Sequence, residues 1–211
     1  EQGNLEFSAL LATGEAQGIR NNQGGVTVDG GGLGDAWSTS LTYSDPIFLA
    51  AIAYDKAIPS NLLGQGFLNA SDTHIDIDKV FAAANTLRLT ARIKPIETLS
   101  LKALIQKSEI EEAKGNPASA ANIDDSVGWL IGAEYRIPNH DKWNIKAQYS
   151  QNTTSFKNND ADYDAQQIMA GVDYAFNKQV RAYGYTGYAT FKQADAKDKQ
   201  PVVGTGLEFK F

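Results

Sequence analysis

Two kinds of residue in this sequence could carry chemistry, and the first is an acidic run that contains a histidine. In Asp72-Thr73-His74-Ile75-Asp76-Ile77-Asp78 an imidazole lies close to several carboxylates, an arrangement that could serve as a general base. A second acidic pair, Asp124-Asp125, occurs in another polar segment. The same carboxylates could instead hold divalent cations. The simplest interpretation is an acidic, solvated loop, and we favour it over a catalytic site.

Other familiar sites have little support in the residue types present. The second histidine, His140, falls in a predicted short turn and cannot join His74. The chain has no cysteine, which excludes disulfides and thiolate metal sites. The glycines at 24–25 and 30–32 lack the preceding strand and following helix of a phosphate loop. The sequence therefore predicts no cofactor and no metal centre.

The second kind of residue is a set of charged side chains that recur at every second position. The clearest case is Leu87-Arg88-Leu89-Thr90-Ala91-Arg92-Ile93, in which every second residue is apolar and the residues between are basic or polar. Strict alternation predicts a β-strand with one apolar face and one polar face. The elements that position the charges are therefore strands.

Segments of this kind recur along the whole chain, whereas helix signals are scarce. Turn residues separate them, as expected between neighbouring antiparallel strands. We predict an all-β chain with ten strands, at residues 4–12, 35–45, 47–57, 80–94, 99–110, 126–137, 143–155, 164–176, 178–192 and 201–211.

The connections between these strands alternate in length. Short links are predicted at 45–46, 95–98, 138–142 and 177–178. The other connections are mostly longer and polar, at 13–34, 57–79, 111–125, 157–163 and 193–200. Short turns at one rim and long loops at the other are typical of antiparallel barrels of the outer membrane.

The aromatic residues support the same interpretation, because on the apolar face they gather at the strand ends. Two aromatic belts around an aliphatic band match the two interfaces of a bilayer. The belt near the short turns comprises Tyr43, Phe48, Tyr135, Trp143, Tyr174, Phe176, Phe209 and Phe211. The belt near the long loops comprises Trp37, Tyr54, Phe81, Trp129, Tyr149 and Tyr188.

Charge follows the same division between the faces. A charge at mid-membrane on a lipid-facing strand costs about 2–4 kcal/mol, so strand charges should lie on the polar face. Nearly all do, and Lys107 is the departure, close enough to the long-loop rim to reach lipid phosphates. The net charge of −6 argues against nucleic acid as a partner. The mean hydropathy of −0.35 fits a soluble protein or a barrel equally.

Several segments resemble the Gram-negative general porin family. Residues 4–15 resemble the strand after the family's mid-barrel turn, and 50–56 resemble a recurrent alanine-tyrosine strand. Residues 179–183 and 203–211 resemble the last two strands. The final alternating strand, with Phe209 and Phe211, resembles the signal read by the barrel-assembly machinery.

The resemblance implies a transmembrane barrel of sixteen strands, of which residues 1–211 would form the last ten within one domain. Residues 1–4 resemble a cut inside a short turn, so we expect the first six strands to accompany this chain. The family's inward-folded third loop has no counterpart here. The resemblance further implies the bacterial outer membrane, contact with lipid bilayer and lipopolysaccharide, and a homotrimer.

We therefore predict a water-filled channel for passive diffusion of small hydrophilic solutes and ions, not an enzyme. The basic side of the pore is assigned to Arg88, Arg92, Lys102, Arg136, Lys146 and Arg181, and its acidic counterparts to Glu134 and Asp173. The alternative is a closed ten-stranded barrel acting as a surface protease or a structural anchor.

Overall fold

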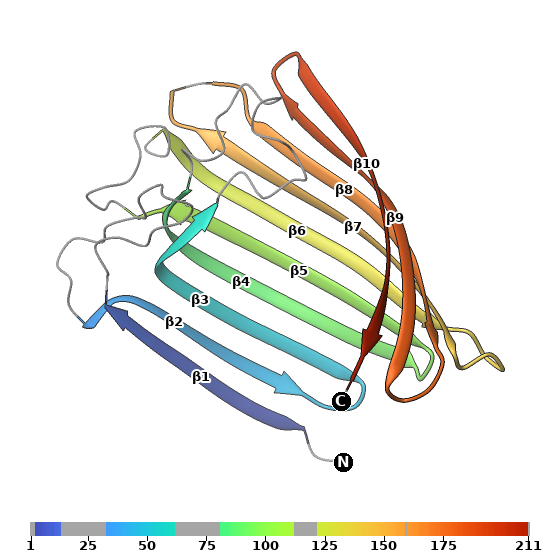
Figure 1. Ribbon diagram of the computed structural model, residues 1–211. Helices are drawn as coiled ribbons and strands as arrows, with labels where there is room; N and C mark the ends of the chain where they lie inside the picture. The colour runs from blue at the N-terminus through green and yellow to red at the C-terminus, as the bar shows by residue number, and fades with distance from the viewer. Residues whose placement is uncertain (1–2, 14–32, 62–80, 112–121, 159, 211) are drawn as a thin grey trace.

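A computed structural model describes the chain over residues 3–13, 33–61, 81–111, 122–158 and 160–210. These residues form a single antiparallel sheet of ten strands, in which each strand lies beside its neighbour in sequence (Figure 1). The described residues contain no helix long and apolar enough to cross a membrane. The prediction of an all-β chain with ten strands is confirmed.

The strand bounds follow the alternation seen in the sequence. They are β1 (Asn4–Thr13), β2 (Leu33–Ser44), β3 (Phe48–Asn61), β4 (Phe81–Ile96), β5 (Leu99–Ile110), β6 (Ile123–Arg136), β7 (Trp143–Phe156), β8 (Tyr163–Ala175), β9 (Val180–Gln193) and β10 (Ala196–Phe209). Apart from the start of β10, most bounds agree with the predicted ones to within a few residues.

The four short turns predicted from the sequence lie at one rim of the sheet, at the lower right of Figure 1, whereas the β9–β10 turn lies at the other. Two of them use the same local chemistry. Asp45 Oδ1 accepts the backbone N–H groups of Ile47 and Phe48 at 2.8 and 2.6 Å. Asn177 Oδ1 accepts those of Gln179 and Val180, both at 2.8 Å. A short polar side chain that caps its own turn is a common way to close a hairpin, and it fixes the register of the two strands.

Two details of the predicted connections are wrong. The connection predicted at 193–200 contains only Ala194 and Asp195, because β10 begins at Ala196 and pairs with β9 along its whole length. Charges on both faces of residues 197–199 hide the alternation, but ladder hydrogen bonds do not need apolar side chains. Asp124 and Asp125, predicted in a loop, lie in β6, where Asp125 is aligned with Glu109.

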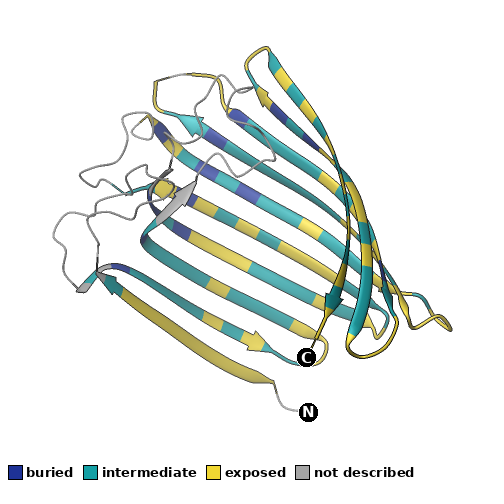
Figure 2. Ribbon diagram, in the orientation of Figure 1, coloured by how far each residue is buried: buried dark blue, intermediate teal, exposed yellow. Residues whose placement is uncertain are grey.

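Burial is concentrated at the rim opposite the short turns, and β1 is exposed along almost its whole length (Figure 2). Ile123 and Thr154 are fully buried at that rim. The apolar and polar faces differ in exposure: along β10 every residue of the apolar face from Val203 to Phe209 is exposed, and the residues between them are half-buried. Lower exposure on the polar face is expected if the sheet curls around that face.

Candidate functional site

The eight charged residues assigned to the pore all lie on the polar face of the sheet. In an antiparallel pair, aligned residues point to the same face. Arg92 is aligned with Lys102, and Lys102 in turn with Gly132, two residues before Glu134. Glu134 is aligned with Lys146, and Asp173 with Tyr183, two residues after Arg181. The strands therefore bring these side chains onto one surface.

Two hollows occupy this surface and account for seven of the eight residues. One, of about 450 Å³, lies toward the short turns and is lined by Arg92, Lys102, Glu134, Arg136, Asp173 and Arg181 among others. The second, of about 440 Å³, adds Lys146 and reaches across to β10. Arg88 lines neither hollow, because it lies earlier in β4 than Arg92 and farther from the short turns. There its Nε donates to Gln106 Oε1 at 3.1 Å.

Ion pairs, with one amide hydrogen bond between β6 and β7, join the strands from β5 to β10 into a ladder. Lys102 Nζ lies 2.9 Å from Glu134 Oε2, and Asn144 Nδ2 donates to the other oxygen of Glu134 at 2.5 Å. Asp173 contacts both Lys146 and Arg181, with 3.1 Å between its Oδ2 and Arg181 Nη1. Charge-assisted bonds of this kind are stronger than neutral ones and fix the direction of each side chain.

The ladder continues onto β10 through a residue outside the predicted site. Arg181 Nη2 pairs with Glu208, and Lys210 Nζ lies 3.6 Å from the same carboxylate. Glu208 has the same alternation as the other polar-face residues, so the sequence signal was present. Its share in an ion network could not be read from the sequence, because that depends on the register of β9 against β10.

Two tyrosines on this face were also missed. Tyr183 and Tyr185 follow Arg181 at alternate positions, and their rings are nearly parallel, with centroids 6.4 Å apart. Each ring lies over a glycine of β10, Gly206 and Gly204 respectively. The alternation of Arg181, Tyr183 and Tyr185 opposite Gly204 and Gly206 is the signal that could have found them. Aromatic rings thus contribute to the polar face beside the ion ladder.

The opposite face carries the aromatic belts. Near the short turns, the ring of Trp143 packs against that of Tyr174 in a tilted arrangement, with 4.8 Å between centroids, and Tyr174 contacts Phe176 edge to face at 4.9 Å. Near the other rim, Trp37 contacts Tyr54 and Trp129 contacts Tyr149, both at 5.2 Å. The sorting of aromatics to the strand ends is confirmed for these residues. The side chain of Phe81 and the whole of Phe211 lie outside the described residues.

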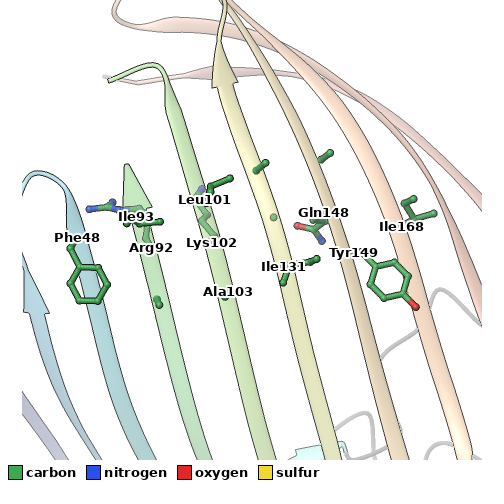
Figure 3. A pocket seen from close by; sticks show the side chains of 14 residues that line it. Phe48, Arg92, Ile93, Leu101, Lys102, Ala103, Ile131, Gln148, Tyr149 and Ile168 are labelled. Atoms are coloured by element: carbon green, nitrogen blue, oxygen red, sulfur yellow. The ribbon is translucent and has the colours of Figure 1, made fainter. Parts of the chain in front are cut away.

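Between the belts this face is aliphatic, with a shallow hollow of about 640 Å³. Figure 3 shows Phe48, Ile131, Tyr149 and Ile168 around it, with the small side chain of Ala103 between them. Ile131 and Ile168 are 53% and 59% exposed. A continuous apolar surface of this extent is unusual on a protein in water and is normal against lipid.

Lys107, the predicted exception on the apolar face, has partners within the sheet. Its Nζ lies 2.8 Å from Glu109 Oε1 and 3.2 Å from Asp125 Oδ2. Asp125 also accepts a hydrogen bond from Ser155 Oγ at 2.7 Å. The charge of Lys107 therefore lies in a polar cluster at the rim and does not have to be buried in lipid.

The structure does not bring together the residues proposed for catalysis within the part of the chain that it describes. His74 and its neighbouring carboxylates lie outside the described residues. His140 is exposed in the turn between β6 and β7, at the opposite rim from Asp125. Within the described ranges, no three His, Asp or Glu side chains gather closely enough to hold a metal ion.

Similar structures agree on the fold. A loop-deletion mutant of OmpT, an outer membrane protein of Vibrio cholerae, is 16% identical with a TM-score of 0.59, covering 98% of this chain and 61% of that one. An anion-selective porin from Comamonas acidovorans is 17% identical with a TM-score of 0.59, covering 97% and 56%. A trimer form of OmpT is 17% identical with a TM-score of 0.54, covering 83% and 56%. The chain thus spans only about three-fifths of the length of these proteins.

The sequence comparison identifies the family. No curated protein matches the chain closely enough to count. The family model described as Gram-negative porin matches residues 2–195, which is most of the chain. Because porins of Gram-negative bacteria are outer-membrane proteins, this match indicates the bacterial outer membrane. The sheet of ten strands, its two chemically distinct faces and the family match agree: the chain belongs to the Gram-negative porin family.

Proposed function

We propose that this chain lines a water-filled channel through which small hydrophilic solutes and ions diffuse passively across the outer membrane. The observation that carries the proposal is the contrast between the two faces of one sheet. Val203 and Leu207 on the apolar face are 81% and 74% exposed, whereas the opposite face holds an ion ladder from Lys102 to Lys210. Lipid covers the first kind of surface, and water solvates the second.

The channel also requires a barrel wide enough to hold water. Barrels of about eight strands fill with side chains, whereas barrels of sixteen to eighteen leave an aqueous channel. Within the described residues, β1 and β10 are the two edges of the sheet. Open edges in lipid leave backbone groups unsatisfied at several kcal/mol each. We therefore propose that further strands of the same barrel, N-terminal to this chain, join β1 to β10.

The assembly is proposed to be a homotrimer in contact with lipopolysaccharide, inserted by the barrel-assembly machinery. The trimer has support from one structural relative, an OmpT described as a trimer form, at 17% identity. Phe209, at the end of β10, belongs to the expected assembly signal, and Phe211 lies outside the described residues. The closed barrel with a protease or anchor role is the alternative, and the acidic run with His74 on which the protease role rests lies outside the described residues.

Conductance of the native particle tests this function. The protein purified from outer membranes should give stepwise openings in a planar bilayer, and its polypeptide masses should reveal the remaining strands. A particle with no conductance and only this chain would contradict the channel and favour the closed barrel.

Selectivity tests the assignment of the polar face. Replacing Arg88 and Arg92 together with alanine should shift the reversal potential in a salt gradient toward cations, with a permeability ratio changed on the order of twofold or more. Lys197 and Lys199, exposed on the opposite face of β10, provide a control with the same loss of charge. Equal reversal potentials in the wild type and the Arg88/Arg92 variant would contradict the assignment.

A further inference from the structure

The charges of the polar face are matched unevenly. From β5 to β10 the main cations have carboxylate partners: Lys102 with Glu134, Lys146 with Asp173, and Arg181 with Asp173 and Glu208. On β4 the pattern changes. Arg92 and Lys94 have no ion pair with any residue that the structure describes. One side of the face is therefore internally neutralised, and the other retains free positive charge.

Arg92 is the most exceptional of these cations. Its aligned neighbour on β5 is Lys102, another cation, so the sheet places like charges side by side. Its Nε is shielded from solvent and has no hydrogen-bond partner among the described residues, as is also true of Ser100 Oγ and of Arg181 Nε, although Arg181 holds two carboxylates through its other nitrogens. Lys102 has Glu134 as its partner, but Arg92 has no counter-charge of its own beside this second cation, and a bound anion would relieve the repulsion.

Arg136 supplies a third cation across the same hollow. Its Nη2 has only a long contact of 3.4 Å to the backbone oxygen of Glu97 in the turn after β4. A contact of that length is weak and leaves most of the guanidinium donors available. Arg92, Lys94 and Arg136 all line the hollow of about 450 Å³ beside the short turns.

The carboxylates of this hollow do not cancel these charges. Glu134 and Asp173 are already committed to Lys102, Lys146 and Arg181. The other two, Glu97 and Asp141, are exposed in turns at the rim. The lining holds six cationic side chains against four carboxylates, so an excess of positive charge faces the hollow.

We propose that this hollow is a binding site for a small polyvalent oxyanion that carries carboxylate or phosphate groups. Guanidinium groups match the planar geometry of such oxyanions with paired N–H donors, and Lys94 adds a mobile point charge. The occupant neutralises the unmatched cations and exchanges with solvent through the lumen. The inference deepens the proposed function and rests on it, since in the membrane a diffusing solute would reach the hollow through the lumen.

The ladder of matched pairs explains why the site is confined to β4 and the end of β6 near the short turns. A cation that already holds a carboxylate gains little from a second anion and loses part of the existing bond. Toward β10 the same hollow ends at Arg181, whose guanidinium is shared by Asp173 and Glu208. Arg88 is separated from the hollow and donates to Gln106. The free donors are therefore Arg92, Lys94 and Arg136.

Calorimetric titration of the detergent-purified native particle tests the site, with citrate and pyrophosphate as probes at low salt. Saturable binding of either probe is expected, and a preference between them identifies carboxylate or phosphate chemistry. The variant Arg92→Gln/Lys94→Gln should lose at least tenfold in affinity. Arg136→Gln, an independent variant on another strand, should also weaken binding. Lys197→Gln/Lys199→Gln, on the opposite face, should bind as the wild type does.

The outcomes separate this inference from the channel itself. A particle that conducts but binds neither probe overturns the site and leaves the channel standing. A conducting Arg92→Gln/Lys94→Gln variant that binds the probes as tightly as the wild type does has the same meaning. Binding that is lost in the variants by a particle without conductance supports the site and contradicts the channel. Retained heat-modifiable migration on gels shows that each variant is folded. If the double variant does not fold, Arg136→Gln alone decides the result.

Discussion

The ring of Tyr185 lies directly over Gly204, its aligned partner on β10, so that a Cβ atom on Gly204 would overlap the ring. Tyr183 lies over Gly206 in the same way, one step toward the short turns. Glycine offers the only surface flat enough for this contact, and the ring in turn covers the exposed backbone of β10. Each tyrosine thereby fastens β10, one edge of the described sheet, to β9.

Gly204→Ala should therefore destabilise the barrel, by about 1–3 kcal/mol, because the added methyl group displaces the ring of Tyr185. The measurement is the denaturant midpoint of the protein folded in phospholipid vesicles. Gly184→Ala is the matched control on β9, since a Cβ there would meet its nearest atom, Thr205 Cγ2, at an ordinary 3.7 Å. Equal midpoints for the two variants would show that the ring moves aside at no cost.

The two faces of β6 make opposite predictions for a single inserted lysine. Ile131→Lys places a charge in the aliphatic band between Trp129 and Tyr135, and should cost about 2–4 kcal/mol in a bilayer. Leu130→Lys places the same charge one residue earlier in the chain, in a hollow of the polar face, and should cost far less. Unfolding in vesicles compares the two. A larger loss for Leu130→Lys would reverse the assignment of lipid and lumen faces.

Much of the fold could be predicted from the sequence because alternation and turn chemistry are local. Leu87–Ile93 shows its two faces within seven residues, and Asp45 and Asn177 mark turns by their own side chains. Prediction was wrong where local polarity is mixed. Residues 196–200 carry charges on both faces, so nothing in their pattern distinguishes a strand from a loop, and only pairing with β9 reveals it.

Sequence alternation predicts which face of the sheet carries the charged residues, but not which of these residues form ion pairs. Alternation places Arg92, Glu134 and Arg181 on one surface, yet it does not say which charges meet. That depends on register: Lys102 pairs diagonally with Glu134, because its aligned residue on β6 is Gly132. The contrast between the matched pairs of β5–β10 and the unmatched Arg92 therefore appears only in the structure.

Asp173 is the carboxylate on which the ladder depends most, because its side chain is only 9% exposed and it contacts two cations. Asp173→Asn should cost about 1–3 kcal/mol, since Lys146 and Arg181 lose an ionised partner in a shielded place. It should also move the reversal potential toward anions, because the lumen gains one positive charge. Glu97→Gln, in an exposed turn, is the control for charge alone. Equal stability of both variants would contradict the structural importance of Asp173.

The turn at Asp45 should make part of the stability depend on pH, whereas its counterpart at Asn177 should not. The backbone N–H of Phe48, and then that of Ile47, hold the pKa of Asp45 below its ordinary value of 3.8. Since the pKa is lower in the folded state, the ionised turn stabilises the fold above the ordinary pKa, and this contribution disappears as pH falls through the folded pKa. Asp45→Asn keeps the cap and removes the charge, as in the turn at Asn177. The wild type should therefore lose more stability than Asp45→Asn between pH 7 and pH 3, with unfolding midpoints as the measurement. Parallel losses in the two proteins would mean that the carboxylate of Asp45 does not contribute through its charge.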